Sequence, residues 1–213
     1  MKTQKLSTTG GPISLAVDGD GATTIVLGHG AGAPLDSDYM AFFATELAQR
    51  GYRVVRFNFP YMEAGRRAPD KQPVLIQTFR AVVEETSADA DLLIVGGKSM
   101  GGRIASHAVA EGMTSDGVVF LGYPLHPPGR PERIRDAHLR DIKIPMLFVE
   151  GTRDPFCPLD TLESVRGDLP APTEVLVIED GDHSLKVRKS SGRDTRAAWT
   201  EAVDGIGKWV SRL

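Results

Sequence analysis

A serine stands inside a glycine cluster in the stretch IVGGKSMGGRIAS, residues 94–106. Its immediate pattern, Gly97-Lys98-Ser99-Met100-Gly101, follows an apolar segment and precedes a segment with helical character. A serine that attacks a carbonyl carbon must stand clear of the backbone on a sharp turn from strand to helix, and flanking glycines leave room for that turn. The pattern therefore predicts that Ser99 is a catalytic nucleophile.

A phosphate-binding loop would end in the same three residues, Gly97-Lys98-Ser99. Such a loop also needs a first glycine, separated from the second by four residues. In this chain that place falls at Leu92 and Leu93, inside the apolar segment. The missing glycine argues against phosphate binding and favours the nucleophile.

A serine nucleophile needs a base and an acid that orients the base. Asp154 comes shortly after the apolar run PMLFVEG, and His183 comes shortly after TEVLVIE. Because the carboxyl ends of parallel strands meet at one edge of a sheet, we expect both side chains near Ser99. Asp180 and Asp182 are alternative partners of the histidine, but Asp154 fits the strand-end position better.

The reaction also needs two N–H donors for the oxyanion that forms during attack. The glycine-rich stretch LGHGAGAP follows the first long apolar run and could aim a backbone N–H at the site. We expect the donors to be the N–H of Met100 and that of Ala31 or Gly32, with His29 shaping the loop and serving as a candidate for substrate binding. A plain glycine-rich turn is the alternative.

These residues must be positioned by regular elements, and six short apolar runs predict strands. They are continuous in their hydrophobicity, which is typical of strands covered on both faces. The six runs are TTIVLGHG from Thr23, YRVVRFNF from Tyr52, DLLIVGG from Asp91, GVVFLGYP from Gly117, PMLFVEG from Pro145 and TEVLVIE from Thr173.

Helical patterns lie between these runs, over residues 37–50, from Pro73 onward, after the serine motif, and at the C-terminus. Alternating strands and helices predict an α/β fold, with a mainly parallel sheet and helices on both of its faces. We expect a single domain over residues 1–213. The stretch GPISLAVDGDGA, with its DGDG turn, is expected to add an antiparallel hairpin at one edge.

The region from Tyr123 to Ile144 is rich in proline and charge and lacks a regular pattern. It predicts a long loop with at most one short helix, so any lid over the site is small. Tyr123 and His126 follow a strand at the same sheet edge and are candidates for lining the pocket.

The chain resembles the small α/β-hydrolase-like family related to dienelactone hydrolases, which includes testis-expressed protein 30 and a regulatory subunit of the chromatin NSL acetyltransferase complex. The segments that carry the resemblance are GHGAGAP, RFNFPYMEAGRRAPD, GGKSMGGRIAS, GYPLHPPGRPE, GTRDPF and GDHSL. The resemblance implies an α/β-hydrolase fold without a large lid and a triad of Ser99, Asp154 and His183. It implies no particular substrate.

The chain departs from dienelactone hydrolases proper, which use a cysteine nucleophile where this sequence has Ser99. Its single cysteine, Cys157, lies three residues after Asp154 and is expected to be a small buried filler. Dienelactone chemistry therefore does not follow from the resemblance.

A possible specificity element is the loop FPYMEAGRRAPDKQP, which carries Arg66 and Arg67. An arginine pair over the site could bind a carboxylate or phosphate of the substrate. The alternative is that both arginines face solvent or pair with the local acids Glu63 and Asp70. Lys98 could likewise bias the site towards anions, point to solvent or pair with an acid.

Composition excludes several classes of function. Basic residues number 25 and acidic residues 28, for a formal net charge of -3, so no basic field is present to collect nucleic acid or an anionic membrane. No stretch has the roughly 20 apolar residues that span a bilayer. With one cysteine, we expect no internal disulfide and a cytoplasmic location. Nothing in the pattern calls for a cofactor or a metal, and nothing indicates the oligomeric state.

Two functions are consistent with the sequence. The first is a serine hydrolase that acts through an acyl-enzyme on a small ester, thioester or related acyl compound, with anionic compounds included among the candidate substrates. The second is a non-catalytic interaction domain that keeps the fold, because fold and activity separate readily. The presence of all three triad residues together with the glycines favours the hydrolase.

Overall fold

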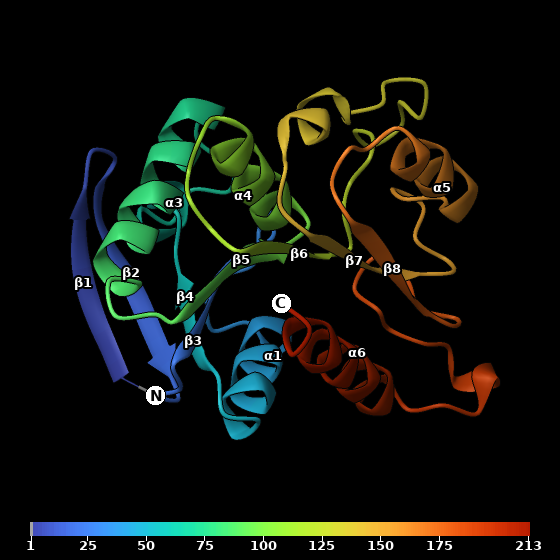
Figure 1. The fold of residues 1–213 in the computed structure, drawn as a ribbon, viewed down its shortest axis with the longest axis horizontal. Helices are drawn as coiled ribbons and strands as arrows, with labels where there is room; N and C mark the ends of the chain where they lie inside the picture. The colour runs from blue at the N-terminus through green and yellow to red at the C-terminus, as the bar shows by residue number, and fades with distance from the viewer. Residues whose placement is uncertain (1) are drawn as a thin grey trace.

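The sheet of this protein has the strand order β1-β2-β4-β3-β5-β6-β7-β8 (Figure 1). The computed structural model describes residues 2–213. Strands β3 to β8 run parallel to one another, and the six predicted strands are confirmed. Their bounds are β3 Thr23–Gly28, β4 Arg53–Phe57, β5 Leu92–Lys98, β6 Gly117–Leu121, β7 Met146–Gly151 and β8 Thr173–Ile178.

Successive residues of the central strands supply two separate cores, one on each face of the sheet. In β6, for example, Val118 and Phe120 join the core on one face, whereas Val119 and Leu121 join the other. Both faces are buried because helices cover them, as the continuous hydrophobic runs predicted.

Helices α3 and α4 cover one face of the sheet, and α1 and α6 cover the opposite face (Figure 1). Each of α1 and α6 buries one apolar stripe against the sheet, formed in α1 by Met40, Phe43, Ala44 and Leu47 and in α6 by Ala198, Trp199, Ala202, Val203, Ile206, Trp209 and Val210. The helices are α1 Asp38–Gln49, α2 Pro60–Glu63, α3 Gln72–Thr86, α4 Met100–Ala110, α5 Leu159–Gly167 and α6 Thr195–Val210, with short 3-10 helices η1 Ala137–Asp141 and η2 Lys189–Ser191.

An antiparallel hairpin forms at the N-terminal edge, but not at the turn we predicted. Strand β1, Lys2–Thr8, pairs with β2, Gly11–Asp18, and the connecting turn lies at Thr9 and Gly10. The DGDG stretch instead links β2 to β3, which are not neighbours because β4 lies between them. The edge hairpin is therefore confirmed and its predicted turn is wrong.

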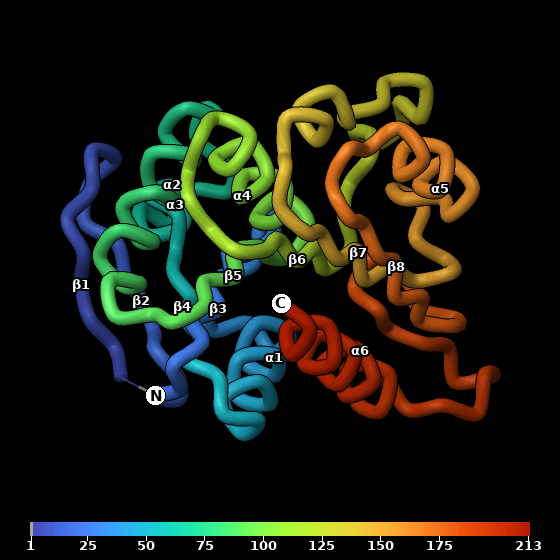
Figure 2. Tube along the Cα trace, viewed as in Figure 1, coloured from blue at the N-terminus to red at the C-terminus, as the bar shows by residue number. Residues whose placement is uncertain are grey.

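The irregular region between β6 and β7 contains only η1, as predicted, and passes beside α4 (Figure 2). No additional domain is inserted there to close over the edge of the sheet. Among residues 2–213, no helix is both long enough and apolar enough to cross a membrane.

Candidate active site

Ser99 occupies a strained turn between β5 and α4. Its φ of 50° and ψ of -112° lie outside the regions that residues other than glycine ordinarily adopt. Such a conformation costs on the order of 1–3 kcal/mol and persists only where the surrounding structure holds it. The turn places the Ser99 side chain at the carboxyl end of β5, in the manner expected of a nucleophile elbow.

Glycines permit this turn because the β3 backbone passes very close to it. A Cβ atom added at Gly97 would lie 2.1 Å from the carbonyl oxygen of Gly28, and one added at Gly101 would also lie 2.1 Å from that oxygen. Both contacts involve backbone atoms, which cannot rotate away. The glycines on either side of Ser99 thus allow the elbow and the loop after β3 to pack together.

Three predicted residues meet in one hydrogen-bonded line. The Ser99 hydroxyl lies 2.8 Å from Nε2 of His183, and Nδ1 of His183 lies 2.7 Å from Oδ2 of Asp154. Asp154 is 4% exposed, and its other oxygen accepts a hydrogen bond from the N–H of Phe156. An imidazole that donates from Nδ1 to a carboxylate presents a free Nε2 lone pair, which can take the proton of a serine hydroxyl.

The alternative partners of His183 have other roles. Asp180 forms ion pairs with Arg188 and Arg153, and Arg188 holds its pKa below the usual value. Asp182 accepts hydrogen bonds from main-chain N–H groups within its own turn, including that of Ser184 at 2.7 Å. Both acids shape the loop that carries the histidine, and only Asp154 contacts its ring.

Lys98 is buried, and no acid among residues 2–213 forms an ion pair with it. Two of the predicted alternatives, a lysine that points to solvent and one paired with an acid, are therefore wrong. Its ammonium donates a hydrogen bond to the main-chain carbonyl of His183 and lies 5.7 Å from the centre of the Tyr39 ring. Burial lowers the pKa of Lys98 to about 8, against the opposing effect of Asp154 and other acids. The lysine therefore ties the elbow to the loop that carries the histidine.

Glu150 lies behind Asp154 and was not singled out from the sequence. It is completely buried, and its Oε1 accepts a hydrogen bond from the N–H of Tyr123 at 2.5 Å. Among the described residues, Oε2 has no donor. Burial and then the nearby Asp154 carboxyl raise the pKa of Glu150 well above its usual value. A protonated Glu150 can donate a hydrogen bond to Asp154, whereas an ionised one would leave Oε2 unsatisfied.

Candidate N–H donors for the oxyanion lie on the first turn of α4 and on the loop after β3. Met100 is the first residue of α4, so its N–H has no acceptor within the helix. The N–H of Gly32 donates to the Tyr61 hydroxyl at 3.4 Å, and Ala31 lines the pocket beside Ser99. Of the two predicted alternatives, Ala31 is therefore the better partner for Met100 in an oxyanion hole.

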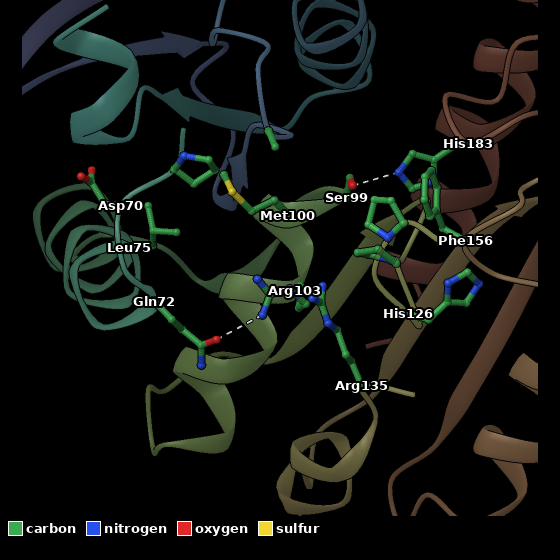
Figure 3. A pocket seen from close by; sticks show the side chains of 14 residues that line it. Asp70, Gln72, Leu75, Ser99, Met100, Arg103, His126, Arg135, Phe156 and His183 are labelled. Carbon is green, nitrogen blue, oxygen red and sulfur yellow. Dashed lines mark hydrogen bonds between the residues drawn. The ribbon is translucent and has the colours of Figure 1, made fainter. Parts of the chain in front are cut away.

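A cavity of about 280 Å³ opens next to Ser99 (Figure 3). Most of its wall is apolar, with polar groups at a few points. The lining residues beside the triad are Ala31, Pro69, Asp70, Gln72, Leu75, Met100, Arg103, Pro124, His126, Pro128, Arg135 and Phe156.

Arg66 and Arg67 do not line this cavity, which corrects the predicted anion-binding pair. Arg66 forms an ion pair with Asp70 at 2.6 Å, and Arg67 is exposed on the loop before α3. The sequence placed this loop near the site, but it did not reveal which side chains turn inwards. Arg103 and Arg135 occupy the cavity wall instead.

Two further candidates, His29 and Tyr123, are buried rather than exposed to the cavity. His29 donates from Nδ1 to the Gly30 carbonyl and accepts the N–H of Phe59 at Nε2, so it supports the loop and has no ring nitrogen left for substrate. Tyr123 is 0% exposed, and its hydroxyl donates to the carbonyl of Arg135. His29 thus shapes the loop, as predicted, but neither residue fits the predicted substrate-binding role.

His126 does line the cavity, as predicted. Its Nδ1 lies 3.0 Å from the Pro127 carbonyl, and its buried Nε2 has no hydrogen-bond partner among residues 2–213. The region described contains no group of three or more histidine, cysteine or acidic side chains arranged to hold a metal ion. Cys157 is a buried free thiol, and burial raises its pKa, so it acts as the predicted filler.

The site combines a strained serine, its histidine and a buried aspartate, all at the carboxyl edge of a parallel sheet. This combination is typical of α/β-hydrolases. The model of the alpha/beta hydrolase domain family matches residues 21–211. This chain belongs to that family. The predicted fold class, a mainly parallel α/β-hydrolase sheet without a large lid, is thereby confirmed.

Solved structures with the same fold share little sequence with this α/β-hydrolase. A Xanthomonas campestris member of the a/b serine hydrolases without lid is 20% identical, with a TM-score of 0.76, and the match covers 98% of this chain and 94% of the other. Dienelactone hydrolase from Anabaena variabilis is 19% identical, with a TM-score of 0.77 and coverage of 100% and 97%. An alpha-beta serine hydrolase homologue from Coxiella burnetii is 16% identical, with a TM-score of 0.75 and coverage of 95% of each chain.

Proposed function

We propose that this α/β-hydrolase cleaves a small carboxylic ester, thioester or related acyl compound through an acyl-enzyme formed on Ser99. The observation that carries the proposal is the line of hydrogen bonds from Asp154 through His183 to Ser99, at 2.7 Å and 2.8 Å, beside the cavity. A merely structural serine would have no need of a strained turn aimed at a histidine and an open pocket.

The first half of the reaction transfers the acyl group. Ser99 Oγ attacks the carbonyl carbon as its proton passes to Nε2 of His183, and the oxyanion accepts hydrogen bonds from the N–H groups of Met100 and Ala31. The tetrahedral intermediate then collapses, the bond to the leaving oxygen or sulfur breaks, and His183 returns the proton to the leaving group. Asp154 keeps the imidazole in the required tautomer.

The second half releases the acid. A water molecule attacks the acyl carbon and gives a proton to His183, which then protonates Ser99 Oγ as the acyl bond breaks. The open pocket gives water direct access. We also propose a cytoplasmic location, supported by the single cysteine, which has no partner for an internal disulfide. We further propose that the chain belongs with the testis-expressed protein 30 and NSL-complex regulatory subunit type, supported by the segments GGKSMGGR and GYPLHPPG.

Labelling with a fluorophosphonate probe tests the proposal, because this reagent reacts with serines activated by a neighbouring base. Wild type is expected to be labelled, and both Ser99→Ala and His183→Ala are expected to lose the label. Ser106→Ala is the control, since its hydroxyl bonds to the Arg103 carbonyl within α4. An unlabelled wild type of native stability would instead support the non-catalytic interaction domain.

A further inference from the structure

Two arginines line one end of the cavity that contains Ser99 (Figure 3). Arg103 lies four residues after Ser99 on α4, a rise of about 6 Å along the helix axis. Arg135 comes from the irregular region before η1 and directs its side chain towards Arg103 (Figure 3). Burial, and then the nearby charge of Arg135, lower the pKa of Arg103. The two guanidinium groups therefore lie close enough to repel each other.

No carboxylate of residues 2–213 forms an ion pair with either arginine. Nη1 of Arg103 donates to the Gln72 side chain at 3.1 Å and lies 3.5 Å from Nε2 of His107, which leaves its remaining N–H donors for other partners. Two neighbouring cations without a counter-ion repel each other, and a bound anion would relieve that repulsion.

The neighbouring residues do not supply that negative charge. Asp70 also lines the cavity, but it forms an ion pair with Arg66 through Oδ1, and its buried Oδ2 has no hydrogen-bond donor among residues 2–213, so it is not a counter-ion of Arg103 or Arg135. His107 and His138 stack with their ring centres 3.6 Å apart, and burial lowers their pKa values to about 4 and about 3, so both rings are neutral at pH 7. Among the described residues that line the cavity, the positive charge is that of the two arginines.

We infer that Arg103 and Arg135 form a subsite for an anionic group, of which a carboxylate is the simplest, on the acyl compound that Ser99 attacks. Guanidinium groups bind carboxylates through paired N–H donors. The apolar lining of the cavity, which includes Leu75 and Met100, fits the hydrocarbon that links the two ends of such a substrate. The inference rests on the proposed function and narrows its substrate class to short esters or thioesters that bear a negative charge.

The position of the charge within the substrate is tested with two matched pairs of esters. In the first pair the charge is on the acyl side: p-nitrophenyl hemiglutarate is compared with its neutral methyl ester. In the second pair the charge is on the leaving group: 4-acetoxybenzoate is compared with methyl 4-acetoxybenzoate. For one pair, wild type is expected to prefer the anionic member in kcat/KM, and that pair identifies the side on which the subsite acts.

Variants then assign the preference to the arginines. In Arg135→Gln, and again in Arg103→Gln, the ratio of kcat/KM for the anionic ester to that for the neutral ester is expected to fall roughly tenfold to a hundredfold, as for the loss of a charged hydrogen bond. Because Arg103 also contacts Gln72, the more exposed Arg135 provides the variant less prone to disturb folding. Arg67→Gln is the matched control, since this exposed arginine lies outside the cavity.

A binding measurement separates this inference from the proposed hydrolysis. Glutarate is titrated by calorimetry into Ser99→Ala and into Ser99→Ala combined with Arg135→Gln, and at least tenfold weaker binding is expected in the second protein. Glutarate binding that depends on Arg135 would support the subsite even if no ester is hydrolysed. Hydrolysis with an unchanged preference ratio in both arginine variants, together with no glutarate binding, would overturn the subsite and leave the hydrolase proposal standing.

Discussion

The Lys98 ammonium donates a hydrogen bond to the main-chain carbonyl of His183 and so joins the residue before the proposed nucleophile to the proposed base. Lys98 is the last residue of β5, and His183 lies on the loop after β8, so the bond joins two segments that are far apart in sequence. A buried lysine is costly unless its donors are satisfied. We therefore regard Lys98 as a positioning residue for the histidine.

Lys98→Met tests this role, because methionine retains much of the apolar stem and removes the donor. The variant is expected to lower kcat for a p-nitrophenyl ester roughly tenfold with a smaller effect on KM, since a displaced imidazole affects the chemical step more than binding. Lys143→Met is the control, because Lys143 also donates to a main-chain carbonyl, that of Arg140, but is exposed. Equal kcat values in wild type and Lys98→Met would contradict the positioning role.

Gly101→Ala is expected to destabilise the protein by about 1–3 kcal/mol, which is typical of overpacking. The added methyl would lie 2.1 Å from the Gly28 carbonyl oxygen and 2.8 Å from that of His29, and neither backbone atom can turn aside. Urea unfolding followed by circular dichroism measures the change. Gly167→Ala, where no atom lies within 4 Å of the added carbon, is expected to be neutral or slightly stabilising. Equal stability of the two variants would contradict the close approach.

The parallel sheet and the line from Asp154 to Ser99 could be predicted because each depends on a strong local signal. Runs of apolar residues without alternation indicate strands that are buried on both faces. Polar residues that directly follow such strands, as Ser99, Asp154 and His183 do, are then expected at the carboxyl edge of the sheet. The same reasoning failed for the DGDG turn. A turn sequence shows where the chain reverses, but it does not show that β4 would lie between β2 and β3.

Side-chain direction was the part of the site that the sequence could not supply. Their positions at strand ends placed His29 and Tyr123 at the correct edge of the sheet. Whether a side chain there enters the cavity or the core depends on its direction from the backbone, and both side chains lie in the core. Arg103 had a usable signal, since it lies one helical turn after Ser99. Arg135 had none, because the path of an irregular loop depends on tertiary packing.

Glu150→Gln is expected to retain at least a third of wild-type activity. If Glu150 is protonated, as its raised pKa indicates, glutamine preserves both the acceptor for the Tyr123 N–H and a donor for Asp154. Steady-state kinetics with a p-nitrophenyl ester measure the effect. Glu150→Ala should lose far more, because the Tyr123 N–H would be left unsatisfied. A hundredfold loss in Glu150→Gln would mean that a negative charge at this position is needed.

The same substitution should change how stability depends on pH. A carboxyl group whose pKa is raised in the folded protein favours folding in its protonated form. That contribution is fully present below the unfolded value of about 4.5 and is lost as the pH rises through the folded value. Glutamine does not titrate. The stability of Glu150→Gln relative to wild type, from urea unfolding, is therefore expected to increase as the pH is raised from 4.5 to 8, and a constant difference would contradict a protonated Glu150.

Glu63 should show the opposite dependence on pH. Burial acts to raise its pKa, but hydrogen bonds from Asn58, Lys5 and Ser14 outweigh that effect and lower it to about 2. A lowered pKa stabilises the folded protein above the unfolded value of 4.5, and this contribution is lost as the pH falls towards 2.

Glu63→Gln is accordingly expected to cost about 1 kcal/mol at pH 7, after allowance for solvent screening, and progressively less between pH 4.5 and pH 2. Urea midpoints for the variant and wild type at pH 7, 5, 4 and 3 measure the difference. Glu84→Gln, an exposed position on α3, is the control and should show no such trend. A difference for Glu63→Gln that is the same at pH 7 and pH 3 would show that the glutamate acts through packing rather than through its charge.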